Sequence, residues 1–227
     1  MRRKWPLAAK DVAKKIKSGL MISIYQLKPR FQNLLRPLVK SCFERGITAN
    51  QVTLAAAGVS VLIGLLLVAL AGHLALFALI PVWMIVRMAL NAIDGMLARE
   101  FGQKSDLGAY LNELCDVIAD AALYLPFALI PGVATPWVVL VVLLSVIAEY
   151  AGVLGTAVGA SRRYDGPMGK SDRAFCFGVL GAGVAVGLLP AALINGVLLV
   201  IALLLIYTVY NRVRRGLTEA ASPPPQE

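Results

Sequence analysis

The stretch NAIDGMLAREFGQKSDLGAYLNELCDVIAD, residues 91–120, places acidic side chains between and inside the most apolar segments of the chain. Its six carboxylates are Asp94, Glu100, Asp106, Glu113, Asp116 and Asp120. A carboxylate at membrane depth is costly unless it is paired, binds a cation or faces a water-filled cavity. The stretch therefore predicts a polar site embedded among apolar helices.

The composition is that of a membrane protein. Of the 227 residues, 59% are hydrophobic and 15% are charged, whereas a soluble domain has about 45–50% apolar and about 25% charged residues. Membrane topology explains the net charge of +9 better than nucleic-acid binding does, so no nucleic-acid partner is expected. The three cysteines lack CxxC spacing and predict neither a disulfide framework nor a zinc site.

Six apolar runs approach the length of about 20 residues that a membrane-spanning helix needs. They predict an all-α fold with transmembrane helices at residues 52–71, 74–98, 107–130, 136–158, 174–192 and 195–211. A short turn near Asn195-Gly196 is expected between the last two helices. The expected organisation is a basic juxtamembrane segment at 1–50, a membrane domain at 51–212 and a disordered tail at 213–227. Within the first segment, residues 8–46 predict one or two amphipathic helices on the membrane surface.

The basic residues predict the orientation of these helices. Of the 22 Lys and Arg residues, twelve precede residue 50, two lie between the second and third helices, four between the fourth and fifth, and three follow the sixth. The remaining one, Arg87, lies inside the second helix, and the opposite loops have none. By the positive-inside rule, both termini should lie on the cytoplasmic side of the inner membrane.

Two polar stripes are predicted to face each other near the cytoplasmic ends of the second and third helices. Asn91 and Asp94 are one helical turn apart, and Gly108, Asn112 and Asp116 recur at every fourth residue. At a rise of about 1.5 Å per residue, Asp94 and Asp116 lie at similar depth. Carboxylate and amide oxygens suit Mg²⁺ or Mn²⁺ and suit zinc poorly. Such an ion commonly handles a phosphate or diphosphate.

Residues 91–116 read NxxDGxxARx8GxxxNxxxD, which closely resembles the CDP-alcohol phosphotransferase signature DxxDGxxARx8GxxxDxxxD. GITANQVTL at 46–54 is similar to the ITPNxxT stretch at the start of the first helix in that family, and the family also has six helices. The resemblance implies an enzyme of phospholipid synthesis that transfers a phosphoalcohol, usually phosphatidyl, from a CDP-linked lipid donor to a polar acceptor alcohol and releases CMP. It also implies a site open to the cytoplasmic leaflet and a homodimer.

The resemblance implies a role for each matching position. Asp94, Asp116, Asn91 and Asn112 would bind one or two Mg²⁺ or Mn²⁺ ions, and Asp116 would be the general base that deprotonates the acceptor hydroxyl. The residues expected around the cytidine diphosphate are Gly95, Ala98, Arg99 and Gly108.

Asn91 and Asn112 stand where the signature has aspartates, so two negative charges are missing. The site could hold one metal ion, bind two weakly until the diphosphate arrives, or be inactive. A catalytically impaired membrane partner descended from the family is therefore an alternative. An ion-coupled transporter is less favoured, because its acids would lie nearer the midplane on interrupted helices.

Two further groups of charges have competing interpretations. Asp120 is expected to form a structural ion pair with Arg87 at the same depth, with Glu149 nearby, although a place in the catalytic site is the alternative. The basic residues of the loop SRRYDGPMGKSDRAF at 161–175 have two interpretations. They either reflect membrane topology alone or resemble the acceptor-phosphate pocket of family members with phosphorylated acceptors. The residues of that expected pocket are Arg162, Arg163, Lys170, Ser171 and Arg173.

Overall fold

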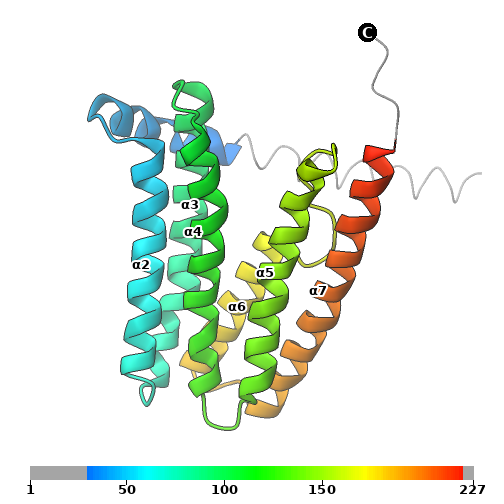
Figure 1. Ribbon diagram of the computed structural model, residues 1–227. Coiled ribbons are helices and arrows are strands. Elements are labelled where there is room, and N and C mark those ends of the chain that lie inside the picture. The colour runs from blue at the N-terminus through cyan, green and yellow to red at the C-terminus, as the bar shows by residue number, and fades with distance from the viewer. Residues whose placement is uncertain (1–29, 222–227) are drawn as a thin grey trace, which may run out of the picture.

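The computed structural model describes residues 30–221 as a bundle of helices (Figure 1). A helix over residues 30–44 lies across one end of the bundle, and no strand occurs within the described range. The bundle helices are α2 (Ala49–Ala69), α3 (Leu79–Glu100), α4 (Asp106–Tyr124), α5 (Thr135–Ala157), α6 (Lys170–Ala185) and α7 (Ala191–Ala220). Two short 3-10 helices, η1 (Leu74–Ala78) and η2 (Leu125–Leu129), precede α3 and follow α4. The all-α prediction is confirmed.

Within residues 30–221, four helical segments are long and apolar enough to cross a membrane. They are α2, α5, α7 and the combined η1–α3 segment Leu74–Glu100. α4 carries four of the acids in the stretch at 91–120, and α6 has only 16 residues. Both nevertheless lie alongside the other four in the described bundle (Figure 1), in which four helical segments have the length and composition of membrane spans.

The expected turn at Asn195-Gly196 is wrong, because these residues lie inside α7. The chain instead turns before Pro190, after Gly187 takes a positive φ of 68°. The polar side chain of Asn195 binds the connection before α5. Its Oδ1 accepts a hydrogen bond from the Ala134 N–H at 2.8 Å. Its side-chain amide donates to the Gly132 carbonyl at 3.1 Å.

The prediction of a tail from residue 213 is also corrected, because α7 continues to Ala220. The sequence there, NRVRRGLTEA, has no proline and remains compatible with a helix. Of the expected surface helices, the part over residues 30–44 is helical, whereas residues 8–29 and the SPPPQE end lie outside the described residues.

Local hydrogen bonds align one end of α2, α3 and α4. Thr48 caps α2 in a reciprocal pair with Gln51, and Ser105 caps α4 by accepting from the Gly108 N–H at 3.0 Å. Gln103, in the turn between α3 and α4, accepts from the Ala49 N–H at 2.7 Å. These bonds satisfy amides at helix starts that have no partner within the helix, and they hold the ends of the three helices together.

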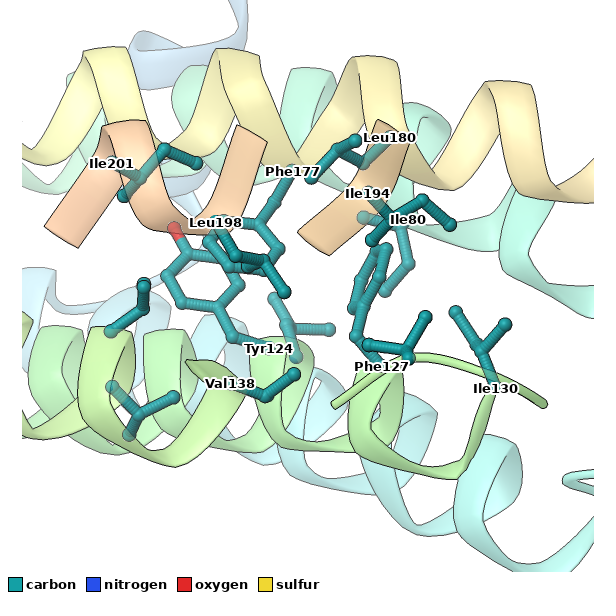
Figure 2. Packing of buried hydrophobic residues seen from close by; sticks show 14 of the residues in the cluster. Ile80, Tyr124, Phe127, Ile130, Val138, Phe177, Leu180, Ile194, Leu198 and Ile201 are labelled. Carbon is teal, nitrogen blue, oxygen red and sulfur yellow. The ribbon is translucent and has the colours of Figure 1, made fainter. Parts of the chain in front are cut away.

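α2 packs closely against α3 and α4, and α5 packs closely against α7, while α6 lies against α3 and η1 (Figure 1). α5 joins its side of the bundle to α4 and η2. An aromatic core fills the end where α3 begins and α4 ends (Figure 2). Tyr124 stacks on Phe177 with ring centroids 3.8 Å apart, and Phe127 meets Phe177 edge-on at 5.1 Å. A second, smaller apolar cluster lies at the motif end, where Leu35 and Val39 of the helix over residues 30–44 pack against Val52, Ile93 and Leu97 of α2 and α3.

Candidate active site

Asp94 is placed by α3 and held by α2. Its side chain is buried, and its Oδ2 accepts a hydrogen bond from the Thr53 hydroxyl at 2.7 Å. Thr53 has no assigned role in the sequence analysis, although it belongs to the motif at 46–54. The signal that could have found it is its position one turn after Asn50, on the face of α2 that meets α3.

The two motif glycines allow close approaches beside Asp94. A Cβ on Gly95 would lie 2.9 Å from Nη2 of Arg99, so the glycine leaves space for this guanidinium to fold back along α3. A Cβ on Gly108 would lie 2.9 Å from Oδ1 of Asn50 and 3.0 Å from the Ser105 hydroxyl. Both glycines therefore keep polar side chains close to the helix surface at the end of the bundle where the motif lies.

Asp116 lies at the junction of α3, α4 and α6. Nη2 of Arg87 lies 3.3 Å from its Oδ1 and 3.1 Å from its main-chain oxygen. The Lys170 ammonium contacts its Oδ2. Asp116 is thereby held against α3 and α6, while Asp94 is held against α2 through Thr53. Asn112, one turn before Asp116, is exposed.

A buried ion-pair network lies directly behind Asp116. Nη1 of Arg87 binds Oδ1 of Asp120 at 2.6 Å, as the depth argument predicts. Arg173 binds the other oxygen of Asp120 at 2.9 Å and Oε1 of Glu149 at 3.0 Å. The network joins α3, α4, α5 and α6, and each charge has a partner, without which burial of a charge is strongly unfavourable.

Arg162 extends this network toward solvent. It forms ion pairs with Glu113 at 2.5 Å and with Glu149 at 3.0 Å, and its guanidinium lies over the Tyr164 ring at 4.1 Å. Glu149 also lies 3.4 Å from Nη1 of Arg212, on α7. The roles of Glu113 and Arg212 could not be predicted from the sequence, because packing sets the rotation of α4 and α7 about their axes.

Arg163 belongs to a second ion-pair cluster. It binds Asp165 at 2.6 Å and contacts Glu219, while Arg215 binds Asp165 at 2.6 Å. Burial raises the pKa of Asp165, but the hydrogen bonds from Arg163 and Arg215 outweigh it and hold the pKa below the ordinary value. The expected acceptor residues therefore divide between two clusters, and Ser171 is exposed outside both.

A groove of about 560 Å³ runs between α3 and α6. Its polar lining comprises Arg87, Asn91, Lys170 and Ser171, and its apolar lining includes Met84, Met88, Phe175 and Val179. Lys170 and Arg87 also contact Asp116. The groove therefore leads from the apolar side of the bundle to the motif.

The oxygen donors fit a divalent ion that a ligand completes. Among residues 30–221, no three His, Cys, Asp or Glu side chains converge on a preformed metal cage. Asp94 and Asp116 supply carboxylates, and Asn91 and Asn112 can supply amide oxygens, which suit Mg²⁺ or Mn²⁺. Lys170 and Arg87 already neutralise part of the charge on Asp116. The remaining ligands would have to come from a substrate such as a diphosphate.

Comparison with known proteins finds relatives over most of the chain. A family model described as CDP-alcohol phosphatidyltransferase matches residues 46–210. The inner membrane protein YnbA of Escherichia coli (strain K12) is 44% identical over 200 residues, which cover 88% of this chain and 99% of that protein. A phosphatidylinositol phosphate synthase of Corynebacterium glutamicum is 35% identical over 123 residues, which cover 52% of this chain and 49% of that protein.

Solved structures have the same fold. The crystal structure of Mycobacterium tuberculosis phosphatidylinositol phosphate synthase with CDP-DAG bound matches with a TM-score of 0.62 at 20% identity, covering 84% of this chain and 98% of that chain. The complex of that synthase with manganese and citrate matches with a TM-score of 0.59 at 21% identity, covering 82% and 91%. At these identities the similarity is evidence of a shared fold.

Proposed function

The chain belongs to the CDP-alcohol phosphatidyltransferase family, and on that basis we propose that it transfers a phosphatidyl group from a CDP-linked lipid to a polar acceptor alcohol, releasing CMP. The observation that carries this proposal is the groove between α3 and α6, which leads from an apolar surface to Asn91, Lys170 and Asp116. A donor lipid can lay its acyl chains in the apolar part while its diphosphate reaches the motif.

The cytidine diphosphate is assigned to the motif residues Gly95, Ala98, Arg99 and Gly108. The absence of a Cβ at Gly95 and Gly108 supports this assignment, because it leaves room beside the polar side chains of Arg99, Asn50 and Ser105. Arg99 is exposed and not locked in an ion pair among the described residues, so its guanidinium is available to the diphosphate.

Asp94, Asp116, Asn91 and Asn112 are the residues proposed to hold Mg²⁺ or Mn²⁺, as one or two ions. When bound, the metal would polarise the diphosphate and neutralise its oxygens. The complex of the structurally similar synthase with manganese supports a divalent ion of this kind. Two amides in place of aspartates favour loose binding before the donor arrives.

Asp116 is the proposed general base. Its carboxylate would take the proton from the acceptor hydroxyl as that oxygen attacks the lipid-linked phosphorus. The phosphorus–oxygen bond to the nucleotide then breaks, and CMP leaves with the bonding electrons. Contacts from Arg87 and Lys170 fix the carboxylate between α3 and α6, at the polar end of the groove.

The proposed setting is the inner membrane, with six spans and with both termini and the site on the cytoplasmic side. The apolar helices, the positive-inside pattern and a relative named inner membrane protein support this assignment. A homodimer is proposed from the family resemblance. Fusing a periplasm-active reporter to the C-terminus tests the orientation, and high reporter activity would contradict it.

CMP release tests the transferase function directly. Purified full-length protein is given CDP-diacylglycerol, a panel of acceptor alcohols and Mg²⁺ or Mn²⁺. Metal-dependent CMP release is expected, and full activity in excess chelator would contradict the metal assignment. If no acceptor and no metal supports release, Asn91 and Asn112 mark a catalytically impaired membrane partner.

Asp116→Asn tests the assignment of the base. Turnover should fall by about 10²–10⁴-fold, the usual contribution of a general base, while CDP-diacylglycerol binding and thermal stability change little. The control is Asp106→Asn, an exposed acid on the first turn of the same helix. Near-normal CMP release by Asp116→Asn, with Asp106→Asn unchanged, would reject Asp116 as the base.

A further inference from the structure

In the loop where the sequence predicts an acceptor-phosphate pocket, each basic side chain faces a carboxylate, and only the Lys170 pair would be opened by a metal ion bound to Asp116. All four of its basic residues form ion pairs in the described part of the chain. Arg162 binds Glu113 and Glu149, and Lys170 contacts Asp116. The other two are Arg163, which pairs with Asp165 and Glu219, and Arg173, which pairs with Asp120 and Glu149.

Solvent accessibility limits which of these basic side chains a ligand can reach. The side chains of Arg173 and Arg212 are only 1% exposed, so a ligand reaches neither of them without opening the bundle. Solvent reaches Lys170 and Arg162, whose side chains are 32% and 19% exposed, beside Glu113 at 29%. The accessible surface next to Asp116 therefore presents both cationic and carboxylate side chains to an acceptor.

A phosphate dianion is poorly suited to this surface. It would have to displace carboxylates from buried or half-buried pairs, or lie next to Glu113 and Glu149, where like charges repel in a poorly screened setting. A neutral hydroxyl group has no such cost. It can donate a hydrogen bond to the Glu113 carboxylate, whose side chain is 29% exposed.

We propose, building on the transferase function above, that the acceptor is an uncharged polyhydroxy alcohol that carries no phosphate. Arg162 and Glu113 form its binding surface beside Asp116, and Glu149 keeps Arg162 from binding an anion.

Matched acceptor pairs test the proposal with the full-length protein and CDP-diacylglycerol. Glycerol is compared with glycerol 3-phosphate, and inositol with inositol 1-phosphate, by CMP release. The unphosphorylated member of at least one pair should have a kcat/KM higher by at least about tenfold. A preference for the phosphorylated member in either pair would overturn the proposal.

A second measurement does not depend on turnover. Thermal unfolding of the detergent-solubilised protein is followed with CDP-diacylglycerol present, with and without millimolar inorganic phosphate. Wild type should show no shift, whereas Glu113→Gln, which removes one of the two carboxylates that pair with the accessible Arg162, should be stabilised by phosphate. Glu149→Gln is a more buried alternative, and Glu44→Gln, on the helix over residues 30–44, is the control.

Stabilisation of wild type by phosphate, equal to that of Glu113→Gln, would overturn the inference. The lack of a shift in both Glu113→Gln and a folded Glu149→Gln would also overturn it, because the carboxylates would then not be what excludes the anion. If no acceptor yields CMP, the proposed transferase function is rejected. The thermal shifts caused by phosphate still test whether Glu113 and Glu149 prevent an anion from binding to Arg162.

Discussion

Lys170 changes the charge that Asp116 presents to a metal ion. The ammonium of Lys170 contacts one carboxylate oxygen, and Arg87 lies 3.3 Å from the other. Asp94, by contrast, accepts a hydrogen bond from the neutral Thr53 hydroxyl. With Asn91 and Asn112 uncharged, Asp94 carries the least compensated negative charge of the motif. Metal affinity in the absence of donor should therefore be weak and limited by Lys170.

Lys170→Gln should raise the affinity for Mn²⁺ because it removes a positive charge that competes for Asp116. We expect an increase of about tenfold, equal to about 1.4 kcal/mol. Titration of Mn²⁺ followed by electron paramagnetic resonance, without donor lipid, measures it. Lys104→Gln, an exposed lysine in the turn between α3 and α4, is the control. Unchanged or weaker binding in Lys170→Gln alone would mean that Lys170 does not limit the metal site.

At the scale of helices, Asp120 connects α3 to α6. Its two oxygens bind Arg87 and Arg173 separately, and both arginines have a further carboxylate partner in Asp116 or Glu149. Removal of one member of an isolated buried pair costs about 3–5 kcal/mol. Shared partners should reduce that cost here, since no charge is left wholly unpaired.

Arg87→Met and Asp120→Leu should each lower thermal stability in detergent, by less than about 3–5 kcal/mol. The double mutant should lose less stability than the sum of the two single losses. With both Arg87 and Asp120 removed, neither charge remains to be left without its partner. Recovery should be partial, since Arg173 still lacks one carboxylate. Lys40→Met and Glu44→Leu, an exposed pair, provide a control cycle with losses near zero. Additive losses would indicate that Arg87 and Asp120 are not coupled.

The contact between α2 and α4 depends on Gly64. A Cβ at this position would lie 2.2 Å from the main-chain oxygen of Ala122, and backbone cannot move aside cheaply. Gly64→Ala should therefore destabilise the fold by about 1–3 kcal/mol. Gly58→Ala, on the same helix with nothing within 4 Å, is the matched control. Thermal unfolding compares the two, and equal stability would show that α2 can shift freely on α4.

Depth along the helices could be predicted from the sequence, and rotation about their axes could not. Counting residues from the helix ends located the Arg87–Asp120 pair because α3 and α4 are consecutive and joined by a short turn. The contacts of Arg212 and Glu113 could not be predicted, because their partners, Glu149 and Arg162, come from segments distant in sequence. The spacing of the motif carries no information on Lys170 contacting Asp116. Asn195 was misread because a polar residue that binds another segment resembles a turn.

At the scale of the whole molecule, the connection between α5 and α6 is fastened to α7 (Figure 1). Met168 donates its N–H to the Thr208 hydroxyl at 3.1 Å, and Arg212 donates to the Asp165 carbonyl at 3.4 Å. The Asp165 carboxylate adds ion pairs to Arg163 and Arg215. This connection carries Arg162 and leads into Lys170, so its attachment to α7 helps to hold the acceptor side of the site.

Asp165→Asn should lower the thermal stability of the whole protein at neutral pH. The pKa of Asp165 lies below the ordinary value of about 3.9. Its carboxylate therefore contributes fully above that value, and the contribution disappears as pH falls through the folded-state pKa. The stability difference between wild type and Asp165→Asn should accordingly be constant near pH 7, narrow below about pH 4 and close at still lower pH. Thermal unfolding across this pH range, with Glu44→Gln as the exposed control, measures the difference. A gap that widens on acidification would mean that the ion pairs of Asp165 do not fasten the connection to α7.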